Sequence, residues 1–275
     1  MERADILARI AAHPLGDDPA AMRAAFHDLI VGAAPVGPRT ATVNTHDHGL
    51  TICPAEPADA PPVVWFHGGG YVFGSPETHL RAALHLAEAH GLTVLLPRYR
   101  LAPEHEWPAQ LNDALAALPG GREVILAGDS AGGHLALVTA LNVPAKVRKL
   151  LLFSPNTDRT GQSETRESMD GADPMVDDAG DRRLAAMCFG AMPDTSRDVS
   201  PLLADLSNLP PTWIEVGTPE VLLDDSRLLH ARAVAAGAEV HLTVTDGLLH
   251  MGQLFAPNWP LARDSLDRAA TFAKR

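Results

Sequence analysis

The stretch REVILAGDSAGGHLALVTALN, residues 122–142, decides the fold of this chain. It opens with an apolar run typical of a buried strand and ends with a pattern typical of a helix. Between the two lies GDSAGG, residues 128–133, which matches G-x-S-x-G. In such a strand-to-helix turn the glycines relieve crowding and push the serine hydroxyl out at the top of a sheet. We therefore predict that Ser130 is an exposed nucleophile.

The rest of the chain repeats this alternation of short β-rich runs and helical patterns, which is typical of a mostly parallel sheet with helices on both faces. The best strand candidates are residues 61–67, 92–99, 122–128, 149–154, 212–217 and 239–245. An earlier pair, 40–46 and 50–55, is expected to begin the sheet antiparallel. Helical patterns cover 78–91, 107–118 and 224–237, the last opened by two aspartates that are typical helix caps.

Two stretches interrupt the alternation and are expected to form a cap. The first is the N-terminal segment 1–37, with helical patterns at 2–12 and 19–31, and the second is 155–200, which is polar and rich in turns. A chain of 275 residues commonly forms one α/β domain. We expect a single domain with these two cap segments.

A second glycine motif, HGGGYVFGS, occupies residues 67–75 directly after an apolar strand. Consecutive glycines leave backbone N–H groups unobstructed, as an oxyanion hole needs, and the N–H of Ala131 at a helix N-terminus is placed for the same task. A phosphate loop is disfavoured because no GK[ST] follows. We interpret His67 as a residue that braces the loop.

The general base is expected late in the chain, since the order of the catalytic residues on such a sheet is serine, acid, histidine. After the strand at 239–245, the loop DGLLHMGQ presents His250, the last histidine of the sequence. His46 and His48 have a spacing that could bind a metal, but no other ligand cluster accompanies them. We interpret that pair as solvated residues at a strand end and expect no metal.

Composition limits the partners. The formal charge of −12 and the pI near 5.4 disfavour nucleic acid and anionic lipid surfaces. The N-terminal segment is interrupted by charges and indicates neither a signal peptide nor a membrane anchor. Cys53 and Cys188 lie far apart without CxxC spacing, so two free thiols are expected. These features predict a cytoplasmic protein.

Several motifs together resemble one family, the hormone-sensitive-lipase-type carboxylesterases, or bacterial GDSAG esterases, of the α/β-hydrolase superfamily. The resemblance runs from about residue 60 to the C-terminus. It rests on five motifs in order: HGGGYVFGSPETH, YRLAPEHEWPAQLNDAL, GDSAGGHLAL, SPLLADLSNLPPTWIEVG and EVLLDDSRLL. Several motifs that agree in order are far more specific than any one of them.

The resemblance implies an α/β-hydrolase fold without a cofactor. It implies Ser130 as nucleophile, His250 as general base, and the backbone N–H groups of Gly69, Gly70 and Ala131 as oxyanion hole. It also implies that two carboxylates of the second motif, Glu104 and Asp113, brace the scaffold, and that the N-terminal helices form a cap over the acyl pocket.

The chain departs from the family where an aspartate usually precedes the glutamate of EVLLDDS, because Pro219 stands there. Four carboxylates could orient the base. Glu220 is favoured, since it lies one residue later and its extra methylene could compensate for the shifted backbone. Asp224 and Asp225 are better interpreted as caps of the next helix, Asp158 is an alternative location after an earlier strand, and a dyad without an acid stays open.

The expected function is hydrolysis of short-chain carboxylic esters or small lactones through an acyl-enzyme intermediate. Two alternatives stay open: a catalytically impaired hydrolase that binds a small molecule, and an amide or carbamate hydrolase, since the same residues can perform that chemistry. The partner is a small-molecule ester. The last strand is expected at a sheet edge, where it could pair with a second copy to form a homodimer.

Overall fold

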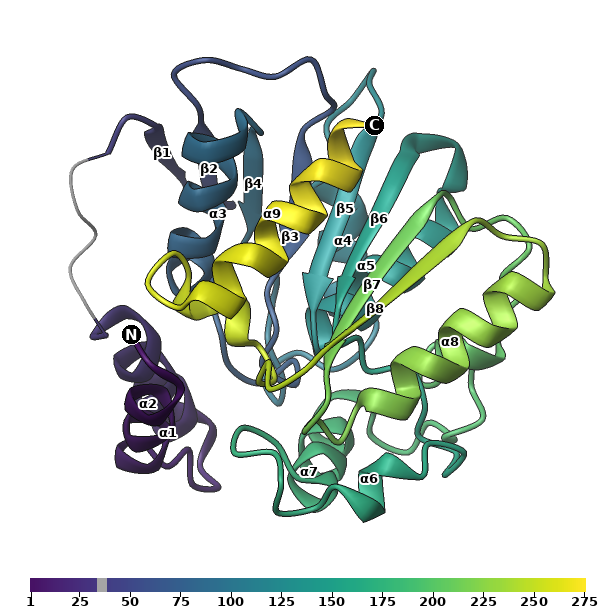
Figure 1. Cartoon of the computed structure of the whole chain (residues 1–275). Coiled ribbons are helices and arrows are strands. Elements are labelled where there is room, and N and C mark those ends of the chain that lie inside the picture. The colour runs from purple at the N-terminus through teal and green to yellow at the C-terminus, as the bar shows by residue number, and fades with distance from the viewer. Residues whose placement is uncertain (34–38) are drawn as a thin grey trace.

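The computed structural model describes residues 1–33 and 39–275. An eight-stranded sheet runs through it in the order β1-β2-β4-β3-β5-β6-β7-β8 (Figure 1). Within the described residues β2 is antiparallel to both neighbours, and the strands from β4 to β8 are parallel. The strands are β1 (Thr42–His46), β2 (Gly49–Cys53), β3 (Val63–Phe66), β4 (Val94–Pro97), β5 (Val124–Asp129), β6 (Val147–Phe153), β7 (Thr212–Gly217) and β8 (Val240–Thr245).

The predicted mostly parallel sheet with an antiparallel start is therefore confirmed. The central strands β3, β5 and β7 are buried along their whole length, which explains why they are continuous apolar runs instead of alternating ones. The expected strand at 92–99 was too long, since β4 covers Val94–Pro97, where its pairing with β2 ends at Gly49.

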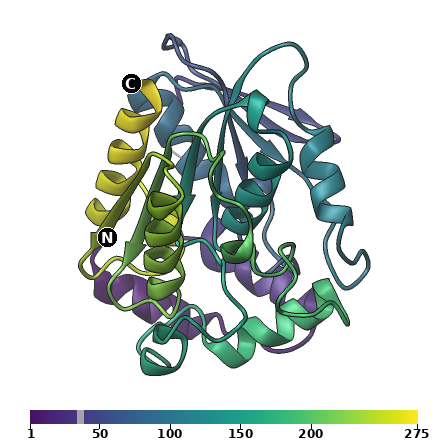
Figure 2. The ribbon, with the colours of Figure 1, turned by 90° about the vertical axis from the view of Figure 1, so that its right-hand side faces the viewer.

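Helices cover both faces of the sheet (Figures 1 and 2). One face carries α3 (Pro76–His90) and α9 (Pro260–Lys274), which pack against each other. The other carries α4 (Ala109–Ala116), α5 (Ala131–Asn142) and α8 (Leu223–Ala235). Both faces of the central strands are thereby removed from water, which is the main stabilising term of such a fold.

The segments expected to form a cap contain helices beside the carboxyl ends of the central strands, at the bottom of Figure 1. These are α1 (Arg3–Ala12) and α2 (Pro19–Val31) from the first segment, and α6 (Thr165–Ser168) and α7 (Asp178–Phe189) from the second. The guanidinium of Arg23 on α2 binds the carboxylate of Glu104 at 2.6 Å and the carbonyl of Ala102 at 2.9 Å. The expected boundary of the first segment at Gly37 lies outside the described residues.

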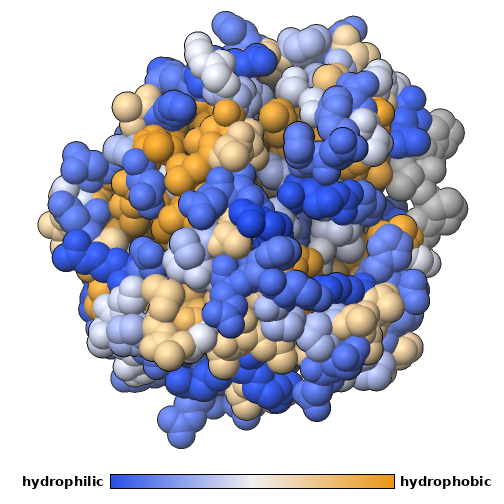
Figure 3. Space-filling model, turned by 180° about the vertical axis from the view of Figure 1, so that it is seen from behind, coloured by the Kyte–Doolittle hydropathy of each residue, from blue (hydrophilic) through white to orange (hydrophobic). Residues whose placement is uncertain are grey.

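In the described part of the chain, the short 3₁₀ helices are η1 (Pro144–Lys146), η2 (Pro201–Leu203) and η3 (Gly252–Phe255). The face seen in Figure 3 is mostly hydrophilic, with hydrophobic residues gathered in its upper left part. Among the described helices, none has the length and apolar character needed to cross a bilayer. The expectation of two free thiols is confirmed, since Cys53 and Cys188 form no disulfide.

Candidate active site

Ser130 sits at the junction of β5 and α5, where the sequence predicts a sharp turn. Its backbone has φ 54° and ψ −122°, a strained combination for a residue with a side chain. The strain is held by hydrogen bonds, since the N–H of Ser130 donates to the carbonyl of Phe153 at 3.0 Å. Glycine is required at Gly132 because a Cβ there would overlap the carbonyl oxygen of Phe66. The sharp strand-to-helix turn predicted at Ser130 is thus present.

The HGGG loop follows β3 directly and faces the same place. Gly69 has φ 115° and Gly70 has φ 59°, conformations that favour glycine. The carbonyl of Gly69 accepts from the N–H groups of Val72 and Phe73, both at 3.0 Å. Within residues 1–33 and 39–275, the N–H groups of Gly69, Gly70 and Ala131 donate to no other protein atom. Three donors are therefore available to a ligand.

His67 lies at the base of this loop and contacts it instead of Ser130. Its Nδ1 is 2.9 Å from the carbonyl oxygen of Gly68, and its ring stacks on Tyr99 with the centroids 4.1 Å apart. The hydroxyl of Tyr99 donates to the carbonyl of His67 at 2.6 Å. Burial lowers the pKa of His67 to about 3, so its ring is neutral. This geometry fits the expected brace.

His250 is held by Glu220. Nδ1 of His250 is 2.8 Å from Oε2 of Glu220, and Glu220 has no exposed surface. The other oxygen, Oε1, accepts from the N–H of Gly217 at 2.6 Å and from the hydroxyl of Ser154 at 2.8 Å. Three donors from three segments thus fix one carboxylate. The carboxylate in turn fixes the tautomer and ring orientation of the histidine.

Burial and negative charge act in opposite directions on the base. Burial favours the neutral form of His250, but the hydrogen bond and charge of Glu220, with the charges of Asp173 and Asp129, outweigh it and raise the pKa of His250 to about 9. Within the described chain, no hydrogen bond joins the hydroxyl of Ser130 to His250, although both line one cavity. Such bonds are often long without substrate and tighten when it binds.

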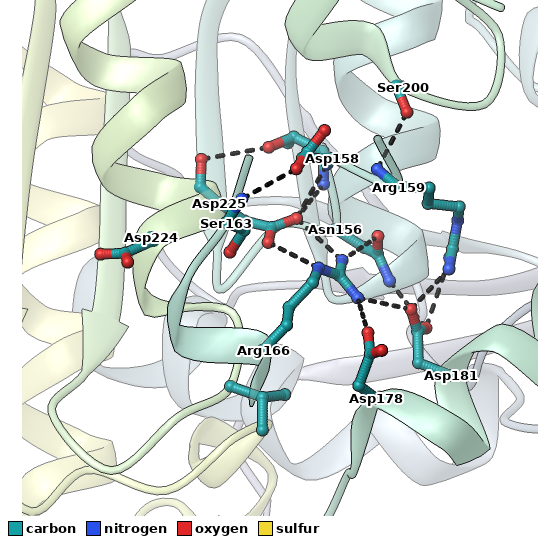
Figure 4. Close-up of polar contacts among 12 residues, drawn as sticks. Asn156, Asp158, Arg159, Ser163, Arg166, Asp178, Asp181, Ser200, Asp224 and Asp225 are labelled. Atoms are coloured by element: carbon teal, nitrogen blue, oxygen red, sulfur yellow. Dashed lines mark hydrogen bonds and ion pairs between the residues drawn. The ribbon is translucent and has the colours of Figure 1, made fainter. Parts of the chain in front are cut away.

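The other candidates for the acid point elsewhere. Asp158 accepts hydrogen bonds from the N–H groups of its own loop, at residues 160, 162 and 163. Asp225 binds the guanidinium of Arg166 at 2.9 Å, whereas Asp224 points away from that group (Figure 4). Each has partners other than His250, so the structure brings Glu220 alone of the four to the base within the described chain.

The interpretation of Asp224 and Asp225 as helix caps was wrong. The cap position of α8 is Leu222, which makes no side-chain cap bond, and the N–H of Asp224 donates to the hydroxyl of Thr165 on α6 at 2.9 Å. Asp225 instead accepts from the backbone N–H groups of Thr157 and Asp158, at 2.7 and 2.9 Å. Both aspartates lie in the first turn of α8 and accept from other segments, since Asp224 also accepts from the N–H of Thr165 at 3.2 Å.

A second carboxylate near the base, Asp173, was missed by the sequence analysis. It belongs to the loop before α7, and its oxygens accept from the N–H groups of Met175 at 2.9 Å and Val221 at 3.4 Å. One ligand atom each of Asp173, Glu220 and His250 lie within 4.8 Å of one another. Burial, opposed by His250, raises the pKa of Asp173 to about 6. No local motif marks this residue, because its partners are distant in sequence.

These groups surround a cavity of about 420 Å³. Its floor contains Ser130, His250 and the glycines of the HGGG loop, and its walls come from α1, α2, the loop before α7, and α7. Leu184 of α7 stands so close to Gly70 that a Cβ there would overlap its side chain. The wall residues on the N-terminal side are Ile10, Ala11, His13, Pro14, Leu15, Gly16, Met22 and Leu29.

The turn at Ser130, the HGGG loop and a buried Glu–His pair meet on a mostly parallel sheet. Residues 63–254, more than half of the chain, match the model of a family described as alpha/beta hydrolase fold. The chain belongs to the alpha/beta hydrolase family. The hydrolase is similar to an acetyl-hydrolase of Streptomyces hygroscopicus, 34% identical over 232 residues, which cover 78% of this chain and 76% of the relative.

It is also similar to an esterase of Acinetobacter venetianus, 34% identical over 75% of this chain and 72% of that one. A crystal structure of an esterase from the bacterial hormone-sensitive lipase family superposes on the hydrolase with a TM-score of 0.91 at 31% identity, covering 99% of this chain and 97% of the other. The resemblance to the hormone-sensitive-lipase-type carboxylesterases is thereby confirmed, and so is the α/β-hydrolase fold.

Proposed function

We propose that this carboxylic ester hydrolase cleaves esters of short acyl chains, or small lactones, through an acyl-enzyme on Ser130. In the proposal His250 is the general base and Glu220 is the acid that orients it. The observation that carries the assignment is the 2.8 Å contact between His250 Nδ1 and Glu220 Oε2, at the wall of the cavity that exposes Ser130. Esterase and acetyl-hydrolase relatives favour it over a binding protein or an amide hydrolase.

The mechanism follows from the positions of these groups. His250 takes the proton of Ser130 as Oγ attacks the ester carbonyl, and Glu220 stabilises the imidazolium that forms. The N–H groups of Gly69, Gly70 and Ala131 hold the tetrahedral oxyanion, a type of donor worth about 3 kcal/mol each in such sites. The imidazolium then protonates the leaving alcohol, and water attacks the acyl-enzyme with His250 as base again.

The size of the substrate is limited by the segments over the cavity. We propose that 1–37 and 155–200 act as cap segments of a single domain, because α1, α2 and α7 supply most of the cavity wall. A volume of about 420 Å³ suits a short acyl group and its alcohol. This favours acetyl to hexanoyl esters.

Two further expectations belong to the proposal. β8 is the last strand of the sheet, and Val244 on it is 39% exposed, so a second copy could pair there as a homodimer. The cytoplasmic location that the charged N-terminal segment predicts stays a prediction.

The function is tested with p-nitrophenyl acetate and a serine-directed phosphonate. The wild-type chain should turn over the ester, and the phosphonate should abolish turnover and label Ser130. Ser130→Ala should lose nearly all activity with an unchanged melting temperature, because loss of this hydroxyl opens no core cavity. Activity of Ser130→Ala above a hundredth of wild type would overturn the assignment.

A further inference from the structure

A second group of ionisable side chains lies on the face of the sheet covered by α3 and α9. Nε2 of His85 and Nε2 of His90 each lie 2.7 Å from the same oxygen, Oδ1 of Asp267. His85 is on α3, His90 is its last residue, and Asp267 is on α9. One ligand atom from each of the three lies within 4.8 Å of the other two. None of them lines the cavity around Ser130.

This arrangement is what a transition-metal ion needs. Imidazole nitrogen and carboxylate oxygen bind Zn²⁺ at about 2.0–2.2 Å, and in a tetrahedral site such ligands stand about 3.3 Å apart. The two Nε2···Oδ1 distances of 2.7 Å would each have to lengthen by roughly half an ångström. Small changes in the side-chain torsion angles can provide this. Each imidazole would bind the ion as its neutral Nδ1–H tautomer, so a proton on Nε2 would move to Nδ1 by exchange with solvent.

Charge and access also fit a cation. Asp267 already places a carboxylate oxygen 2.7 Å from Nε2 of each imidazole, so an anionic ligand lies where the ion would bind. Its side chain is 40% exposed while those of His85 and His90 are 9% and 16% exposed, so the site has an open side for an ion and a water ligand. The ammonium of Lys274 would repel a bound cation, but its Nζ is exposed to solvent and lies 3.5 Å from the carbonyl oxygen of His90.

We propose that His85, His90 and Asp267 bind a divalent transition-metal ion of the Zn²⁺ class, with water as fourth ligand, and that the ion cross-links α3 to α9. The ion takes no part in ester cleavage. Its effect is on stability, because it joins residues 182 positions apart in the sequence. α3 also carries His79, whose Nε2 is 2.9 Å from Asp129 beside the nucleophile, so the cross-link steadies a helix that supports the active site.

The binding test uses ZnCl₂ with the purified, chelator-treated full chain in equilibrium dialysis, and CoCl₂ for its visible absorption. The wild type should bind one ion with the d–d spectrum of a low-coordinate nitrogen and oxygen site. His85→Ala, His90→Ala and Asp267→Asn should each weaken binding at least tenfold, because each removes one of three ligands. At Zn²⁺ about a hundredfold above Kd, the wild-type melting temperature should rise by about 5 °C or more.

Two matched controls make the result specific. His46→Ala/His48→Ala removes the exposed histidine pair that the sequence analysis considered, and Asp264→Asn neutralises a different exposed carboxylate of α9. Both should bind Zn²⁺ like the wild type. Esterase activity without metal should be unchanged in His85→Ala, whose melting temperature without metal shows that it folds.

The proposal is overturned if the wild type binds no more Zn²⁺ than His85→Ala, or if the His46/His48 variant loses the ion. It is also overturned if phosphonate on Ser130 blocks binding, which would place the ion at the nearby group of Asp173, Glu220 and His250. Binding that survives the phosphonate and fails in Asp267→Asn supports it.

Discussion

Glu220 and Asp225 are five residues apart in the sequence and equally buried, yet their partners differ in kind. Glu220 receives two neutral donors and an imidazole, and the far side of that imidazole faces the cavity. Asp225 receives the guanidinium of Arg166 and two backbone N–H groups. A buried carboxylate thus contacts a titratable imidazole in one place and a permanently charged guanidinium in the other. The partner decides the role of the carboxylate.

The Asp225 group extends further than a single ion pair (Figure 4). Arg166 on α6 also binds Asp181 on α7 at 2.9 Å, and Asp181 is shared with Arg159. The network therefore ties α6 and α7 to α8. Burial opposes ionisation of Asp181, but the two guanidinium groups overcome it and lower its pKa below the usual range. Removing one partner would leave an uncompensated buried charge.

The largest effect is expected at Glu220. Glu220→Gln should lower kcat by about 10⁴-fold on one ester, because the amide no longer holds the productive tautomer or stabilises the imidazolium. Kinetics with p-nitrophenyl butyrate measure this. Asp158→Asn and Asp224→Asn are the controls, expected near wild type, and retention of more than a third of wild-type kcat by Glu220→Gln would show that it is not the acid.

Substitution of Asp225 should lower the stability of the protein and leave kcat nearly unchanged. Asp225→Asn should destabilise the protein by about 3–5 kcal/mol, because it leaves the Arg166 guanidinium buried with less compensation. The melting temperature should fall by roughly 10 °C, while kcat per folded molecule stays within a few-fold of wild type. Asp224→Asn, one residue away and partly exposed, is the matched control. A 10⁴-fold loss of kcat at unchanged melting temperature would show that Asp225, like Glu220, acts in catalysis and not in stability.

The dependence of the rate on acyl length tests whether the Asp225 group affects the active site, because Asp181 of that group also lines the cavity. Wild type should cleave acetyl to hexanoyl esters at least tenfold faster than decanoyl esters, without activation at an oil–water interface. Asp181→Asn should weaken this preference, because α7 and its Leu184 are then less firmly held. A series of p-nitrophenyl esters measures both, and faster cleavage of palmitoyl esters by wild type would contradict the closed pocket.

The smallest effect concerns pH. His250 must be neutral to act as base, so with its pKa raised to about 9, kcat/KM should rise with pH well above the ordinary histidine value of 6.5. Asp173→Asn removes one charge that raises this pKa and should move the acidic limb to lower pH, though less than Glu220→Gln does. Because the pKa of His250 is higher in the folded protein, its protonation adds to the free energy of unfolding. This contribution is fully present below pH 6.5 and is lost as pH rises through about 9. An unchanged limb in Asp173→Asn would show that its charge does not reach the base.

Much of the fold and part of the site could be predicted from local sequence. The order of strands and helices was readable because parallel strands buried on both faces are continuous apolar runs. The turn of Ser130 and the loop of His250 could be placed because both follow identifiable strands in a fixed order. Asp173 could not be found, since its contact with Val221 joins segments 48 residues apart. The partners of Asp224 and Asp225 were misjudged because position in a first turn does not tell which face of the helix is covered.

The sequence by itself determined the α/β architecture, the sharp turn that carries Ser130, the glycine loop after β3 and the position of His250 after the last strand. Each of these depends on φ and ψ preferences and apolar periodicity within a few residues. Only the tertiary structure decided which carboxylate reaches His250, which ones bind arginines, and that His85, His90 and Asp267 converge. Those outcomes depend on distances between segments that are far apart in the chain, and such distances are set by packing across the whole sheet.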